Sequence, residues 1–329
     1  MDSKISLIII KTGSTSGKEI SQLCESITWS GKRSSPTRTL EFTILDDDGY
    51  NHDRAGIDIE KGYHALFYYD DEELFRGIIL RQTGQYSKKS SYKAYDVGIY
   101  LSNNKDTFVY ESQTATYVFK DVCNRFGITV GSAASTSYTI PDLTKKKTTG
   151  WDAIEDALSL DYENTGTQYY VYAKQGKLYL AKRAENLKQW VLETGVNIAT
   201  YKYTKSLEDV KTRIKLLSSE GTTLASATNS SLEAKIGVFQ GVDTPDESLT
   251  TAQIKSLASS LLSEQSATEH TLQLSKVLGQ VDVISGVAVY VEIDHLDLSK
   301  TFYVDSDTHT FKGNLHTMSL TLNLSLESD

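Results

Sequence analysis

The sequence predicts a β-rich α+β protein of several domains, and three observations point to this fold class. The chain has 329 residues, which is more than one ordinary domain of roughly 100–200 residues holds. Near both ends, apolar residues alternate with polar ones, which is the period of half-buried strands. In the middle, apolar residues recur at helical intervals. We therefore expect a β domain in residues 1–102, a small α+β domain in 103–185, and a second β domain with one helix in 186–329.

The first domain is predicted to consist mostly of strands. In residues 39–44, Leu40, Phe42 and Ile44 alternate with polar residues, so one face of this strand is buried and the other is wet. Further predicted strands, with Asp70 and Asp71 as one of the turns between them, are 4–12, 62–69, 74–82 and 92–101. About five or six strands in so short a stretch are typical of a small barrel or sandwich.

The middle domain is predicted to combine helices with strands. Val118, Val122 and Phe126 recur every four residues, and Gly127 follows them where a helix would end in a left-handed cap. A second helix is expected to begin near Trp151. Two strands follow in the segment TQYYVYAKQGKLYLA, and the Gln-Gly pair in its centre predicts a tight hairpin turn.

From residue 186 onward the pattern returns to strands. The last strand is the clearest, because Met318, Leu320 and Leu322 face one way and the polar residues between them face the other. One helix is predicted within this region, since Thr250 and Gln253 have the spacing of a capping box and apolar residues follow them at helical intervals. We expect this helix to cover an otherwise open end of a sheet.

The composition excludes several classes of function. The formal net charge is −9, with a pI of about 5.3, whereas nucleic-acid binding needs clustered Lys and Arg. The only basic triplet, 145–147, is interpreted as a solvated loop. The longest apolar run near the N-terminus, 7–10, is far shorter than the roughly 20 residues of a membrane helix, and no cleavage site follows, so we expect a chain made in the cytoplasm without a membrane segment. Cys24 and Cys123 lie in unrelated segments and are expected to be buried fillers.

Two acidic groups are candidates for chemistry. The first lacks the spacing of an EF-hand calcium loop and is interpreted as a loop between strands; it contains Asp46, Asp47, Asp48, Gly49, Asn51 and Asp53. The second consists of Asp152, Glu155, Asp156, Asp161 and Glu163. Residues 152, 155 and 156 share a helix face, within the range of separations that glycoside hydrolases use. This face lies opposite the apolar stripe, where carboxylates are ordinarily just solvated.

The histidines offer few metal sites. His309 and His316 flank the segment TFKGNL and are expected to face each other across a hairpin, while His295 lies two residues from Asp297 on one predicted strand face. No third ligand stands at a sensible spacing, so we expect no metal. The sequence also lacks the nucleophile-elbow, P-loop and dinucleotide motifs, so no cofactor is expected.

Tyrosine is abundant, with 20 residues, which raises the question of a carbohydrate-binding face. Tyr169, Tyr170 and Tyr172 occupy both faces of one predicted strand. Tyrosine is also favoured in strands and at interfaces, so this pattern favours an interface over a single flat platform.

Four segments together resemble a known family over essentially the whole chain. They are ITWSGKRSSPTRTLEFTILDDD (27–48), YDVGIYLSNNKDTFVYESQTATYVFKDVCNRFGI (95–128), GWDAIEDALSLDYENTGTQYYVYAKQGKLYL (150–180) and FYVDSDTHTFKGNLHTMSLTL (302–322). The chain resembles the PBSX-type prophage tail-hub proteins of contractile phages and phage-tail-like bacteriocins, which are related to the late control D class. The most specific pieces surround Trp29, Trp151 and the stretch from His309 to Met318.

The resemblance implies a fold of two tail-tube-like β-barrel domains with a small inserted α+β domain. It implies a structural baseplate hub, a homotrimer with pseudo-six-fold symmetry that joins the tail tube protein to the central spike protein and contacts other baseplate and tape-measure-associated proteins. Such a hub would be incorporated into the phage tail or bacteriocin particle. The family carries no catalytic residues, so none is assigned here. The alternative is a peptidoglycan hydrolase or cell-wall carbohydrate-binding module of the tail tip that uses the carboxylates of residues 152–163.

A cationic loop lies between the two strands of residues 25–44. It contains Lys32, Arg33, Pro36 and Arg38. Because Pro36 has no N–H for ladder pairing, we interpret the loop as a long connection between two barrel strands. Its cations are expected to face a neighbouring subunit or tube protein, with plain solvent exposure as the other interpretation.

Overall fold

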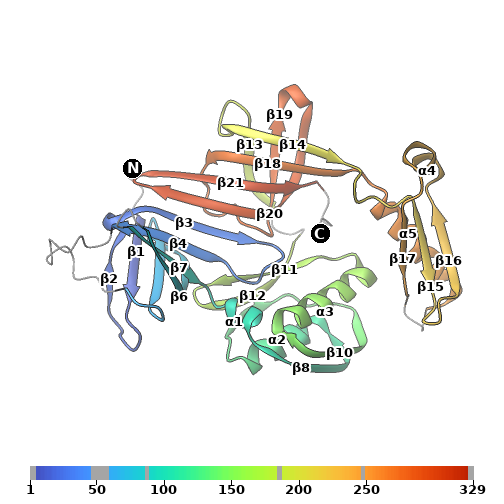
Figure 1. Ribbon diagram of the computed structural model, residues 1–329, viewed down its shortest axis with the longest axis horizontal. Helices are drawn as coiled ribbons and strands as arrows, with labels where there is room; N and C mark the ends of the chain where they lie inside the picture. Colours follow the sequence, from blue (N-terminus) through green and yellow to red (C-terminus); the bar gives the residue numbers. More distant parts are fainter. Residues whose placement is uncertain (1–4, 46–58, 86–88, 184–186, 246–248, 325–329) are drawn as a thin grey trace. The chain divides into compact units, whose positions relative to one another are not determined.

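The computed structural model describes residues 5–45, 59–85, 89–183, 187–245 and 249–324 (Figure 1). The chain forms two compact units. The first comprises residues 1–202 and 273–322, and the second comprises 203–272 and 323–329. Strands are the main element of both units, which confirms the predicted β-rich class.

The N-terminal strands of the first unit belong to a large sheet. They are β1 (Ile5–Ile10), β2 (Gly17–Glu19), β3 (Cys24–Lys32), β4 (Thr39–Leu45), β5 (His64–Tyr69), β6 (Glu72–Gln85) and β7 (Lys89–Tyr95). Their order across the sheet is β3-β4-β7-β6-β5-β1-β2, and a short 3₁₀ turn, η1 (Ser21–Leu23), precedes β3. Leu40, Phe42 and Ile44 point inward as predicted, because successive side chains of a strand face opposite sides. Asp70 and Asp71 form the predicted turn, both with positive φ.

The predicted strand 92–101 is wrong in its second half. The strand β7 ends at Tyr95, and the helix α1 (Ile99–Asn103) follows. Asp96 ends the strand, because its carboxylate accepts the backbone N–H groups of Arg38 at 3.0 Å and of Gly98 at 2.9 Å. A Cβ on Gly98 would lie 1.9 Å from the carbonyl oxygen of Pro36, so only glycine fits this crossing of backbones. Apolar residues continue at every second position past the turn, so the sequence pattern predicted a longer strand than the structure has.

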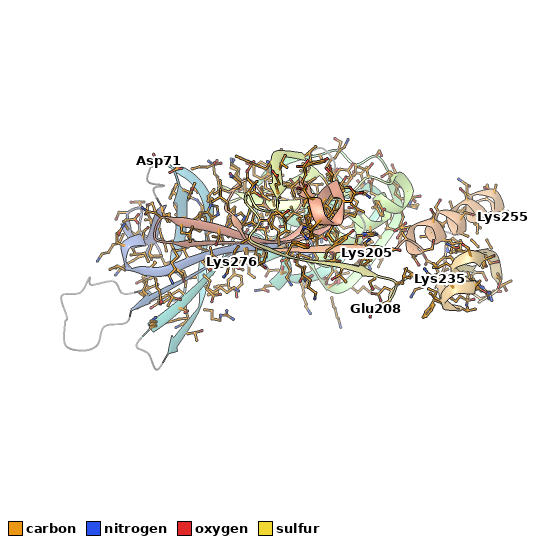
Figure 2. All side chains as sticks on the ribbon, turned by 90° about the horizontal axis from the view of Figure 1, so that it is seen from above. Asp71, Lys205, Glu208, Lys235, Lys255 and Lys276 are labelled. Atoms are coloured by element: carbon orange, nitrogen blue, oxygen red, sulfur yellow. The ribbon has the colours of Figure 1, made fainter. Side chains whose placement is uncertain are left out.

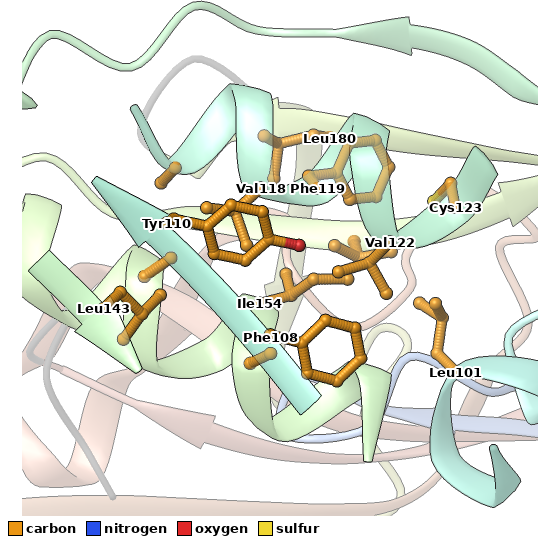
Figure 3. Close-up of a cluster of buried hydrophobic side chains, with 14 of the residues drawn as sticks. Leu101, Phe108, Tyr110, Val118, Phe119, Val122, Cys123, Leu143, Ile154 and Leu180 are labelled. Atoms are coloured by element: carbon orange, nitrogen blue, oxygen red, sulfur yellow. The ribbon is translucent and has the colours of Figure 1, made fainter. Parts of the chain in front are cut away.

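The middle segment folds as predicted into helices and strands around one core. Its elements are β8 (Lys105–Thr114), α2 (Ala115–Arg125), β9 (Val130–Ala133), β10 (Thr139–Thr149), α3 (Gly150–Thr165), β11 (Tyr169–Lys174) and β12 (Lys177–Lys182). Figure 3 shows Phe108, Phe119, Val122 and Ile154 meeting in this core, where all four side chains are fully buried. The predicted hairpin turn forms at Gln175 and Gly176, and both residues, not the glycine alone, have positive φ.

The basic triplet lies in a strand rather than in a loop. Residues 145–147 belong to β10, and the pairing of β10 with β8 shifts register between Lys145 and Thr148. Lys147 takes a φ of 57° at this bulge. Lys145 forms an ion pair with Asp156 of α3, so the triplet helps to attach the helix to its sheet.

The C-terminal strands continue the large sheet. They are β13 (Leu187–Glu193), β14 (Thr200–Ser206), β18 (Glu269–Leu278), β19 (Ala288–Ile293), β20 (Leu298–Lys312) and β21 (Leu315–Asn323). The order is β14-β18-β21-β20, and β19 lies beside β20 with β13 on its other side. Met318, Leu320 and Leu322 are buried as predicted. The boundary between the two units falls within β14 and β18.

The two sets of strands share one order. The strands of the N-terminal set are β1, β3, β4, β5, β6 and β7. When they are numbered one to six along the chain, their order across the sheet is one, four, five, six, three, two. The six strands β13, β14, β18, β19, β20 and β21 lie in the same order. The first and fourth strands differ between the two sets in their relative direction. The strand β1 runs antiparallel to β5, whereas β13 runs parallel to β19. The fifth strand of the C-terminal set, β20, also pairs with the second strand of the N-terminal set, β3.

The second unit has its own core. A three-stranded sheet in the order β16-β15-β17 is formed by β15 (Arg213–Leu217), β16 (Thr223–Thr228) and β17 (Gln240–Asp243), with the helices α4 (Ser230–Ile236) and α5 (Thr251–Gln265). Thr250 and Gln253 form the predicted capping box. The helix α5 packs its apolar face on Ile214 and Leu216, so it covers a face of this small sheet and not the open end of a large one. Lys255 extends from its other side (Figure 2).

Candidate functional site

The junction between β3 and β20 joins strands from the two ends of the chain. Six residue pairs run antiparallel from Ser306 opposite Lys32 to Phe311 opposite Ile27. The strand β20 is long enough to hold two neighbours along one edge, because its first part, 298–303, pairs with β19, while β21 lies on its other edge.

Arg38 is buried at the junction and forms a two-pronged ion pair with Asp307. The Nη1 to Oδ1 distance is 2.8 Å and the Nη2 to Oδ2 distance is 2.5 Å, while the side chains are 6% and 1% exposed. The guanidinium also lies over the ring of Trp29, 4.1 Å from its centroid. Gly31 makes room for it, since a Cβ there would lie 2.3 Å from Arg38 Nη1. Asp307, Trp29 and Gly31 therefore surround the guanidinium of Arg38.

The carboxylate of Asp307 remains ionised in this setting. Burial alone would raise its pKa, but the adjacent Arg38 guanidinium and the hydrogen bonds that it donates hold the pKa below the usual value. The backbone N–H of Ser285 donates a further bond of 2.6 Å to Oδ1. A buried charge pair of this kind needs all its partners, because each ion has lost its water.

A second ion pair lies beside the first. Asp305 accepts from Arg183 Nη2 at 2.6 Å and lies 3.4 Å from Arg33 Nε. Arg183 is fully buried and also donates to Gln168 at 3.1 Å. Burial lowers the pKa of the Arg183 guanidinium, and Asp305 opposes this effect. The middle segment is thereby attached to β20 through one charged side chain.

The expectation for the cationic loop is therefore wrong for two of its three cations. Arg38 and Arg33 face Asp307 and Asp305 of the same chain, and not a neighbouring subunit or the solvent. Lys32 is exposed. The sequence carried one signal for these partners, since aspartates at alternate positions of a strand that also has buried apolar residues require a counter-charge. It gave no indication that the counter-charges stand about 270 residues away in the chain.

The predicted histidine pair is confirmed. His309 Nδ1 lies 3.0 Å from His316 Nε2, and His309 Nε2 lies 3.1 Å from the carbonyl oxygen of Val283. A carbonyl only accepts, so His309 carries its proton on Nε2 and accepts at Nδ1 from His316. Burial lowers the pKa of His309 to about 4 and that of His316 to about 3. Both rings are therefore neutral at pH 7.

No metal site accompanies these histidines in the part of the chain that the structure describes. There, no three His, Cys, Asp or Glu side chains are grouped so that they could hold an ion. His295 lies in the 3₁₀ turn η2 (Asp294–Leu296), and Asp297 ends that turn in a left-handed conformation, so the two do not share a strand face as predicted. His295 contacts the hydroxyl of Tyr201 instead. The acidic group Asp46, Asp47, Asp48, Gly49, Asn51 and Asp53 lies outside the described residues.

The carboxylates of α3 have structural partners. Asp152 accepts the N–H of Thr149 at 3.1 Å in a capping box, and the hydroxyl of Thr148 lowers its pKa. Asp156 pairs with Lys145. Asp161, which is not on the face that residues 152, 155 and 156 were predicted to share, is buried and accepts the N–H of Tyr138 at 3.0 Å. The remaining two, which are exposed, are Glu155 and Glu163.

The tyrosines of β11 lie on both faces of the strand, as predicted. Tyr169 belongs to the core, whereas Tyr170 and Tyr172 form a stack with Tyr179 of β12, with ring centroids 5.5 and 5.1 Å apart. Gly131 closes one end, since a Cβ there would lie 2.1 Å from the Tyr179 ring. The ring faces thus cover one another, which leaves no flat aromatic surface for a sugar.

Both cysteines are free thiols. Cys123 is buried as predicted, and Cys24 is half-buried. Burial raises the pKa of each thiol to about 12, so neither is a reactive thiolate at neutral pH.

Several strand edges of the large sheet are open within the described residues, including those of β2 and β13. The strand β14 ends the sheet order and has β18 on one side only. The strand β6 pairs with β5 through residues 72–78, but its later part, 80–85, has only β7 beside it. Open edges present N–H and C=O groups that pair readily with another chain.

Within the described helices, none combines the length and apolar character needed to cross a membrane.

Comparisons with known proteins identify a family, related sequences and similar folds. A model of the family described as YQBQ-like matches residues 27–323. The phage-like element PBSX protein XkdQ of Bacillus subtilis strain 168 is 35% identical over 301 residues, which covers 91% of each chain. The 43 kDa tail protein of prophage MuSo2 from Shewanella oneidensis has a similar fold, with a TM-score of 0.72, 13% identity, and coverage of 97% of this chain and 98% of that one.

A more distant structure extends the comparison of folds. The E. coli c3393 protein, a component of the type VI secretion system with structural similarity to the bacteriophage T4 tail proteins gp27 and gp5, matches with a TM-score of 0.53 and 10% identity. The match covers 99% of this chain and 78% of that chain. At such low identity the likeness concerns the fold alone.

Proposed function

The chain belongs to the YQBQ-like family and is a PBSX-type phage tail protein, and from this premise we propose that it is the structural baseplate hub of a contractile phage tail or phage-tail-like bacteriocin. In this proposal three copies form a ring that joins the tail tube to the central spike. The observation that carries it is the strand order shared by the N-terminal and C-terminal sets. A chain with two similar halves can present six similar modules from three copies, which suits contact with a six-fold tube.

The proposal includes a domain division. Residues 1–102 and 186–329 form the two tail-tube-like barrel domains once the ring is assembled, and residues 103–185 form the small α+β insertion between them. The second compact unit, 203–272, then lies within the C-terminal domain as an elaboration between β14 and β18. The partners are further copies of the chain, the tail tube protein, the spike protein, and other baseplate and tape-measure-associated proteins, all within the particle.

Co-assembly with the tail tube protein tests the proposal. When the two proteins are expressed together, we expect rings or short tubes in electron micrographs, each with the hub at one end. The tube protein expressed alone sets the background of spontaneous tubes. If the two proteins elute separately and no end-capped rings form at any ratio, the proposed function is wrong.

The proposed role needs no catalysis, and a cell-wall assay tests this part. We expect purified protein to leave the turbidity of a peptidoglycan suspension unchanged, because Asp152, Asp156 and Asp161 of the acidic group are held in structural contacts. The matched variant is Glu155→Gln, which alters an exposed carboxylate of the same helix. A loss of turbidity that this variant abolishes would instead support the hydrolase alternative.

A further inference from the structure

The junction between β3 and β20 provides a template for a contact that one chain alone cannot make. At this junction the second strand of the N-terminal set pairs with the fifth strand of the C-terminal set. The corresponding second strand of the C-terminal set is β14, and the corresponding fifth strand of the N-terminal set is β6. Both strands have an open edge among the described residues, as do β2 and β13, which correspond to neither strand of the junction.

The fifth strands, β20 and β6, correspond residue by residue. Each pairs with the fourth strand of its set, through Ala288 opposite Tyr303 and through His64 opposite Ile78, the first residues of β19 and β5. Tyr303 therefore corresponds to Ile78. The burial of the residues agrees with this alignment. Phe302 and Val304, on either side of Tyr303, are fully buried, and Ile79, which corresponds to Val304, is fully buried as well.

The later parts of these strands differ in burial. In β20, the inward-facing residues Asp307 and His309 are covered by the neighbouring β3 and are at most 1% exposed. Their counterparts in β6 are Gln82 and Gly84, and both are exposed. Leu80, which precedes them, is 42% exposed. Among the described residues, the part of β6 that corresponds to the covered part of β20 has no neighbouring strand on that edge.

The open edge of β14 has the composition of a pairing strand. Its sequence, TYKYTKS, alternates β-branched, aromatic and cationic residues, and it has a neighbour on one side only. Lys202 and Lys205 on this strand keep a free edge soluble, as charged residues commonly do on edge strands that have a partner only in an assembly.

We propose that β14 of one copy pairs with residues 80–85 of β6 in the next copy, as β3 pairs with β20 within a chain. This inference rests on the proposed hub function and specifies its subunit contact. Each copy gives one edge and receives another, so the contact is head-to-tail, the type of contact that forms a ring when the rotation between copies closes. Transferring the register of the internal junction, where Lys32 at the end of β3 lies opposite Ser306, places Ser206 opposite Arg81 and Thr204 opposite Thr83.

Disulfide trapping between two separately tagged copies tests this pairing. In a background with Cys24→Ser and Cys123→Ala, one copy carries Thr83→Cys and the other Thr204→Cys, both at exposed positions. Residues directly opposite on adjacent strands lie within the range that a disulfide bridges. After co-assembly with the tube protein and mild oxidation, we expect cross-linked pairs at least tenfold above those from Thr83→Cys mixed with Ser260→Cys, an exposed position on α5.

The outcomes separate this inference from the proposed function. Tyr203→Cys and Lys205→Cys are tested alongside Thr204→Cys, so that a shift of one residue in register still gives a product. If rings form but none of the three positions cross-links to Thr83→Cys, the pairing is wrong and the hub remains. If Thr83→Cys is trapped by a cysteine scan of the tube protein instead, the partner is the tube and not a second copy. If no ring forms at all, both proposals fail.

Discussion

Replacing Asp307 with alanine is expected to lower the free energy of unfolding of the first unit by about 3–5 kcal/mol, since removing one member of a buried ion pair leaves the other charge without compensation. Arg38 would lose both carboxylate bonds, and the N–H of Ser285 would lose its acceptor. Urea unfolding followed by tryptophan fluorescence, in a background with Trp151→Phe and Trp190→Phe, measures the loss, because the Arg38 guanidinium lies 4.1 Å from the ring centroid of the remaining Trp29.

Two variants show whether the effect comes from the buried charge. Glu41→Ala removes a carboxylate that contacts Arg81 and Lys93 on an exposed surface, and we expect it to cost less than about 1 kcal/mol. Combining Arg38→Met with Asp307→Leu removes both charges and should recover much of the lost stability, since an apolar pair of similar volume avoids the desolvation cost. A loss below about 1 kcal/mol for Asp307→Ala would mean that the pair does not hold the junction together.

The local pattern of this chain is predictable because side-chain period and turn chemistry act over a few residues. The strand around Phe42, the helix α2 that ends shortly before Gly127 and the capping box at Thr250 each depend on neighbours in sequence. The turn at Asp96 was missed for the opposite reason. Its carboxylate ends the strand by accepting an N–H from Arg38, which lies 58 residues earlier in the chain.

The polar contacts of the junction were predictable in kind but not in partner. Arg38 was visible as a charge in the loop before a predicted strand and Asp307 as a charge in a segment with alternating apolar residues, and a buried charge needs an opposite one. Which charges meet depends on β3 lying beside β20, a pairing across most of the chain that no local pattern encodes. His309 and His316 were predicted to face each other because a short hairpin alone brings them together.

The same cluster makes the first unit sensitive to acid. A histidine whose folded pKa lies below its unfolded value near 6.5 contributes stability that is fully present above that value, and this contribution is lost as the pH falls toward the folded pKa. The folded values are about 4 for His309 and about 3 for His316. Asp96 acts in the opposite sense, because burial raises its pKa to about 7, so acidification from pH 7 to 4 relieves the cost of its buried charge.

Replacing His316 with phenylalanine isolates the histidine contribution, because Asp96 is present in both proteins and cancels in the comparison. The ring stacks on Phe311 with centroids 4.2 Å apart, so phenylalanine keeps the packing while it removes one titrating group and the donor to His309. We expect the variant to be less stable than the wild type at pH 7 by about 1–3 kcal/mol, since His309 Nδ1 loses its partner. Between pH 7 and pH 4, however, it should lose about 3 kcal/mol less than the wild type.

Urea midpoints at both pH values measure this difference, and His64→Gln, which replaces an exposed histidine of β5, serves as the control and should keep the full acid sensitivity of the wild type. Neutral rings form a hydrogen-bond chain from His316 through His309 to the carbonyl of Val283. A proton added to His309 at Nδ1 sets one N–H against another, and a proton added to His316 at Nδ1 is buried without an acceptor. Equal losses in the wild type and in His316→Phe would show that acid acts on the first unit through other groups.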